Sequence, residues 1–120
     1  MSSVQRPLAG EVLVHHLGQD EGMIDAALME RSGRSARTLV KEGPLRLTMM
    51  GLSGGGSLAT HRAEGPVSIH VLKGSVEFLA QGQTYPLGAG DVVVFGAGVE
   101  HSATSRDGAV ILLTVVQDTA

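Results

Sequence analysis

The sequence predicts an all-β protein, a single barrel or sandwich of short strands with one short N-terminal helix. Three observations support this: short runs rich in valine and other apolar residues recur along the chain, glycine-containing turns separate them, and some runs alternate apolar and polar residues. In the run from Leu45 to Met50, leucine or methionine occupies the odd positions, and Arg46 and Thr48 lie between them. A period of two is typical of a strand with one buried face.

Residues 20–31 are predicted to form the helix. Asp20 can cap its first turn, Ile24 and Leu28 lie on the same face, and Gly33 follows as a stop signal. We expect this helix to pack over one opening of the barrel. The whole chain is then one domain, with an N-terminal arm and helix in residues 1–35 and barrel strands in residues 36–117.

Glycines mark the predicted turns. Gly43-Pro44 separates a strand at Thr38 to Lys41 from the strand at Leu45 to Met50, and Gly54-Gly-Gly56 forms a turn rather than a phosphate-binding loop. Later turns are predicted at Lys73-Gly74, Gln81-Gly82, Gly88-Ala-Gly90, Gly96-Ala-Gly98 and Asp107-Gly108. The Asp-Gly pair is a strong hairpin signal.

Composition argues against several functional classes. The 120 residues carry a formal charge of −3 with a pI near 5.9 and no cluster of Lys or Arg, so nucleic acid is not an expected partner. No apolar run is long enough to span a bilayer, and we expect a cytoplasmic protein without a membrane partner. Because the chain has no cysteine, any metal ligand must be His, Asp, Glu or water.

The first of two histidine-containing segments lies between Gly55 and Gly74. His61 follows Gly55 after five residues, and Val-Leu-Lys-Gly74 closes the segment. These positions resemble the first motif of the cupin superfamily, which reads Gly, five residues, His-x-His, three or four residues, Glu, six residues, Gly. Ala63 stands at the second His of that motif and Val67 at its Glu.

The second segment resembles the second cupin motif, which reads Gly, five residues, Pro-x-Gly, two residues, His, three residues, Asn. Gly90, Gly98 and His101 match it, whereas Gly96 replaces the Pro and Ser105 the Asn. The resemblance implies one cupin-type barrel, a double-stranded β-helix or jelly roll, with a degenerate metal-binding motif. A looser resemblance links the chain to small single-domain bacterial cupins of unassigned reaction.

Strand parity predicts which side chains face the interior. Val67 and Ile69 point to one side of their strand, and extending the parity backwards adds His61 and Ala63. In a cupin that side is the barrel interior. The predicted ligand pocket comprises Met49, His61, Ala63, Val67, Ile69, Phe95 and His101.

Three functions remain open at this level, and whether the chain is an enzyme stays undecided. The first is a module that binds a small organic ligand in the apolar barrel. The second is a cupin-type metalloenzyme, an oxygenase, isomerase or lyase, with a divalent ion (Zn, Fe, Mn or Ni) on His61, His101 and, as a weaker candidate, Glu64. The third is a non-catalytic interaction protein that forms a homodimer through a strand edge near its N-terminus.

Overall fold

The computed structural model describes residues 12–17 and 31–117. Within these ranges the chain forms eight strands: β1 (Arg34–Glu42), β2 (Leu45–Leu52), β3 (Ser57–His61), β4 (Val67–Ala80), β5 (Gln83–Gly88), β6 (Val92–Phe95), β7 (His101–Thr104) and β8 (Ala109–Val116). Nearly all of the helix predicted at residues 20–31 lies outside the described residues. No helix in the described ranges is long and apolar enough to cross a membrane.

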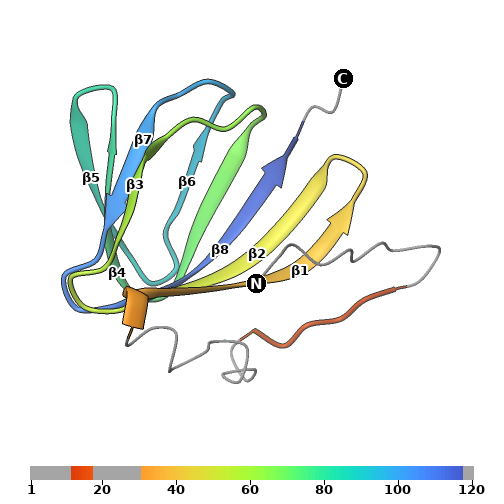
Figure 1. Ribbon diagram of the computed structural model, residues 1–120, viewed down its shortest axis with the longest axis horizontal. Coiled ribbons are helices and arrows are strands. Elements are labelled where there is room, and N and C mark those ends of the chain that lie inside the picture. Colours follow the sequence, from red (N-terminus) through yellow and green to blue (C-terminus); the bar gives the residue numbers. More distant parts are fainter. Residues whose placement is uncertain (1–11, 18–30, 118–120) are drawn as a thin grey trace.

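The strands form two antiparallel sheets that share β4. The first sheet has the order β1-β2-β8-β4-β6, and the second has the order β3-β7-β4-β5. In Figure 1 the strands splay from a common lower region, with β5, β7 and β3 on one side and β8, β2 and β1 on the other. This curled all-β architecture agrees with the fold class that the sequence predicts.

The longest strand crosses from one sheet to the other. The N-terminal half of β4 pairs with β8 and β6, and its C-terminal half pairs with β7 and β5. The turn predicted at Lys73-Gly74 is therefore wrong, because the strand continues through it. The register shifts between Val71 and Lys73, and Gly74 has a φ of 76°. A bulge followed by a left-handed glycine bends a strand without ending it.

The hairpin predicted at Asp107-Gly108 is also wrong. This connection leads from β7 in the second sheet to β8 in the first, and the two strands do not pair with each other. The buried side chain of Ser105 links this connection to β4. Its Oγ donates a hydrogen bond to the Ser75 carbonyl oxygen at 2.7 Å and accepts one from the Gly108 amide at 2.9 Å. The residue at the Asn position of the second motif thus has a structural role.

Two other sequence predictions are confirmed. The strands expected around Gly43-Pro44 are β1 and β2, which pair from Glu42 opposite Leu45 up to Arg34 opposite Leu52. Gln81 and Gly82 connect β4 and β5, with φ values of 52° and 76°. Positive φ at both central residues is the signature of a tight type I′ hairpin, whose twist matches that of the flanking strands.

Buried side chains form two clusters, one on each face of the first sheet. The interior cluster lies between the two sheets and contains Leu52, Val67, Ile69, Val71, Val76, Phe78, Ala80, Ala103, Ala109 and Ile111. The outer cluster contains Leu39, Val40 and Met49, with Leu17 packed against it. Because neighbouring strand residues point to opposite faces, β2 supplies Met50 to the first cluster and Met49 to the second.

We predict that Gly74→Ala destabilises the fold more than Gly82→Ala. Both glycines have a φ of 76°, so both substitutions carry a backbone cost of about 1 kcal/mol. At position 74 a Cβ would also lie 2.0 Å from the Gly108 carbonyl oxygen, whereas nothing lies within 4 Å at position 82. Urea unfolding should give a loss of at least about 2 kcal/mol for Gly74→Ala. Equal losses would contradict the steric argument.

We also predict that Ser105→Ala lowers the free energy of unfolding by about 1–3 kcal/mol, because it removes the hydroxyl that bonds Ser75 and Gly108 in a buried site. Ser57→Ala is the matched control, since Ser57 is exposed. The control should change the stability by less than about 0.5 kcal/mol. Thermal unfolding of both variants tests the difference, and similar melting temperatures would refute it.

Candidate functional site

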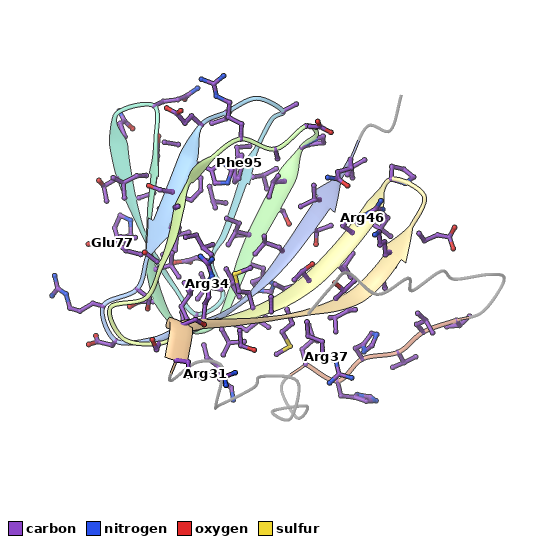
Figure 2. All side chains as sticks on the ribbon, viewed as in Figure 1. Arg31, Arg34, Arg37, Arg46, Glu77 and Phe95 are labelled. Atoms are coloured by element: carbon purple, nitrogen blue, oxygen red, sulfur yellow. The ribbon has the colours of Figure 1, made fainter. Side chains whose placement is uncertain are left out.

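His101 begins β7 and is 5% exposed. Its ring centroid lies 4.4 Å from that of Phe95 and 5.8 Å from that of Phe78, and the two phenyl centroids are 5.1 Å apart. The imidazole is therefore part of a three-ring cluster that includes Phe95, which is labelled in Figure 2. Aromatic contacts at these distances hold a ring in one orientation.

A hydrogen bond fixes which nitrogen of His101 carries a proton. Nδ1 lies 2.9 Å from the carbonyl oxygen of Val99. Because a carbonyl only accepts, Nδ1 must be the donor, and the neutral ring then has its lone pair on Nε2. Nε2 is the atom at which this imidazole can accept a hydrogen bond or coordinate a cation.

The backbone of His61 lies directly opposite that of His101. His61 ends β3, and the β3–β7 register pairs the two residues after an irregularity that begins at Leu58. Directly opposed residues in an antiparallel pair are the closest cross-strand neighbours. The register therefore brings together the backbones of the two motif histidines, although they are forty residues apart in the sequence.

The other predicted pocket residues fall into different places. Val67 and Ile69 belong to the interior cluster, and Ala63 and Phe95 pack against it. The structure places Met49 in the outer cluster instead, because β2 turns that residue away from the space between the sheets. The side chain of Glu64 is exposed in the loop between β3 and β4.

Two backbone hydrogen bonds hold this loop. The Gly98 amide donates to the Ala63 carbonyl at 2.9 Å, and the Val116 amide donates to the Pro66 carbonyl at 3.1 Å. A Cβ at Gly65 would lie 1.6 Å from the Val116 carbonyl oxygen, so the close approach requires glycine. The loop is thus fixed between the loop that follows β6 and the end of β8.

The side chains at the motif positions do not fit a cupin metal centre. A catalytic metal site needs about three protein donors, but Ala63 offers a methyl group and Val67 an isopropyl group that is 3% exposed. Among the described residues, no group of three His, Asp or Glu side chains could hold a metal ion.

A hollow of about 290 Å³ adjoins His101 at the end of the β4–β5 hairpin. Its lining comprises Leu79, Ala80, Gln81, Gly82, Gln83, Thr84, Glu100, His101 and Ser102. Nη2 of Arg62 lies 3.8 Å from Oε2 of Glu100, and both side chains are mostly exposed. Sequence reasoning missed these polar residues. The Gln81-Gly82 turn signal was the available clue, but the pairing of Ala80 with His101 was needed to place the hairpin beside the histidine.

The sequence pattern that defines the cupin domain matches residues 40–116, which is more than half of the chain. The chain therefore belongs to the cupin family. None of the curated proteins matches it.

Solved structures agree with this fold. A conserved protein of unknown function, SPY1581 from Streptococcus pyogenes, is 24% identical, with a TM-score of 0.70 over 100% of this chain and 98% of its own. An RmlC-like cupin from Desulfovibrio desulfuricans is 20% identical, with a TM-score of 0.74 over 88% and 97%. The Cnp3 cupin domain from Schizosaccharomyces pombe is 15% identical, with a TM-score of 0.73 over 90% and 76%. At these identities the likeness establishes the fold alone.

We predict that Val67→Glu, which restores the motif residue, creates a pH-dependent loss of stability. Burial raises the pKa of the introduced carboxyl above the value of about 4.3 that it has in the unfolded chain. The free energy of unfolding that Val67→Glu loses relative to the neutral variant Val67→Gln should therefore be small below about pH 4.3. It should grow to about 3 kcal/mol as the pH rises towards the raised folded-state pKa.

Unfolding of both variants between pH 4 and pH 8 checks this expectation. The loss for Val67→Gln should stay constant over that range, because an amide does not titrate. A difference between the two variants that does not change with pH would mean that water or a cation reaches position 67.

Proposed function

We propose that this cupin binds a small, uncharged organic molecule at the end of the barrel where His101 lies. The proposal rests on the surroundings of the His101 imidazole. It is buried against Phe78 and Phe95, its tautomer is set by Val99, and a hollow adjoins it. The two phenyl rings contact the imidazole, and the lining of the hollow adds polar side chains, among them those of Gln81, Gln83 and Glu100. Ligand sites commonly combine apolar contacts with a few oriented polar groups.

Size and charge restrict the ligand class. The hollow of about 290 Å³ is at the lower end of the range for small-molecule sites. Glu100 contributes a carboxylate to the lining, which disfavours an anion. A compact apolar or aromatic body with one hydroxyl or amide N–H fits best, because Nε2 can accept a hydrogen bond from that donor.

A metal-dependent enzyme is the second candidate, and one observation favours it: the register that sets His61 opposite His101. The hydrocarbon side chains at positions 63 and 67 argue against it. Metal analysis of protein purified without chelator or affinity histidines separates the two candidates. One equivalent of a divalent metal that is lost in both His61→Ala and His101→Ala would favour the enzyme.

Phenol and toluene form a matched pair of probes for the binding proposal. They have similar shapes, but only phenol has a hydroxyl that can donate to Nε2. One hydrogen bond is worth about 1 kcal/mol, so phenol should bind roughly fivefold more tightly than toluene. Titrations followed by ¹⁵N shifts of the histidine ring nitrogens measure both affinities and identify the ring involved.

Two variants locate this preference. His101→Leu should reduce the ratio of the two affinities to about one. His70→Leu should leave it unchanged, because His70 pairs with Val92 and Leu112 while its neighbours Ile69 and Val71 are buried in the interior cluster. The proposal fails if neither probe saturates, or if the preference for phenol survives in His101→Leu.

A further inference from the structure

A second hollow, of about 360 Å³, lies on the second sheet away from His101. Residues of β4 and β5 line one part of it, and the connection from β7 to β8 lines the rest. It adjoins the open end of the β4–β5 hairpin, whereas the hollow beside His101 adjoins the turn. The lining comprises Ser75, Val76, Glu77, Pro86, Leu87, Gly88, Arg106 and Asp107. A volume of this size is sufficient for a small metabolite.

Three charged side chains belong to this lining: Glu77 on β4, and Arg106 and Asp107 on the connection. Val76 and Phe78 are buried in the interior cluster, so the alternation of β4 turns Glu77 to the outer face of the sheet. Figure 2 shows Glu77 at this outer margin. Within the described part of the chain, none of the three charged side chains forms an ion pair. One guanidinium and two carboxylates are therefore available to a ligand.

Backbone hydrogen bonds hold both walls of this hollow in place. The connection is fixed to Ser75 on either side of its two charged residues: Ser105 Oγ donates to the Ser75 carbonyl oxygen at 2.7 Å, and the Ser75 amide donates to the Gly108 carbonyl oxygen at 3.4 Å. On the β5 wall, the Gly88 amide donates to Oδ2 of Asp91 at 2.8 Å, and the Asp91 amide donates to the Gly88 carbonyl oxygen at 2.9 Å. A backbone that is fixed before binding lowers the entropic cost of holding a ligand.

We propose that this hollow binds a free basic amino acid of the lysine type. The Arg106 guanidinium binds the α-carboxylate through paired N–H donors, a geometry that arginine offers and lysine does not. The carboxylates of Glu77 and Asp107 bind the two ammonium groups, and the ring of Pro86 contacts the methylene chain. Three ligand charges then meet three charges of opposite sign, which a diamine or a simple anion cannot achieve. This proposal does not rest on the ligand proposed beside His101.

Lysine, cadaverine and norleucine form a matched set of probes. Cadaverine is lysine without its carboxylate, and norleucine lacks the side-chain ammonium. Each missing charge removes one ion pair at an exposed site, so lysine should bind about fivefold more tightly than either of the other two. Titrations followed by ¹H–¹⁵N shifts measure the three affinities. Lysine should shift the amides of Ser75, Gly88 and Asp107 and leave the imidazole signals of His101 unchanged.

Three variants assign the roles of the charged groups. Arg106→Gln should lower the ratio of the lysine to the cadaverine affinity to one or below, because it removes the partner of the carboxylate. Glu77→Gln should weaken lysine and cadaverine by a similar factor and leave the ratio above one. Arg37→Gln is the matched control, since Arg37 is an exposed arginine on β1 in the other sheet, and it should change neither affinity.

All the substituted side chains are exposed, and circular dichroism should show that the variants fold like the wild type. The assignment of lysine to this hollow fails if lysine causes no saturable shift at the three amides. It fails equally if the preference for lysine over cadaverine survives in Arg106→Gln, or if Arg37→Gln abolishes that preference as well.

Discussion

The architecture depends on a single strand that belongs to both sheets. β4 forms backbone ladders with β8 and β6 before Gly74 and with β7 and β5 after it. The bend turns Val67, Ile69 and Val71 of one half, and Val76, Phe78 and Ala80 of the other, into the same interior cluster. The site depends on the bend as well, because Phe78 packs on His101 and Ala80 pairs with it.

The sequence predicted what local patterns encode. Alternation located β1 and β2, and the Gln81-Gly82 pair located a tight hairpin. Gly74 and Gly108 were misread because a bend within a strand and a crossing between sheets need the same positive φ as a turn. Only the partner strands distinguish these cases, and partners are set by tertiary structure.

The candidate site was also predictable only in part, because local patterns do not specify the partner strands. Parity along one strand identified Val67 and Ile69, which the structure buries between the sheets. Along β2 the prediction placed Met49 in the pocket, whereas Met50 is the methionine that packs against the interior cluster. Both residues are apolar, and only the register with β8 assigns their faces. The polar rim around the hollow depends on how the β4–β5 hairpin lies against β7, which no local signal specifies. The motif glycines keep the cupin frame although two of the four ligand positions, Ala63 and Val67, carry hydrocarbon side chains, so the fold does not depend on a complete ligand set.

The position of β8 has a consequence for how the chain reaches this structure. β8 lies between β2 and β4, and its ladder joins Val116 to Leu45. On the ribosome, β1 and β2 emerge early and must wait for residue 116 before their sheet closes. Pairing between such distant parts of a sequence slows folding. During that interval the edge of β2 that later pairs with β8 has no partner, so the nascent chain is open to chaperones and to aggregation at this stage.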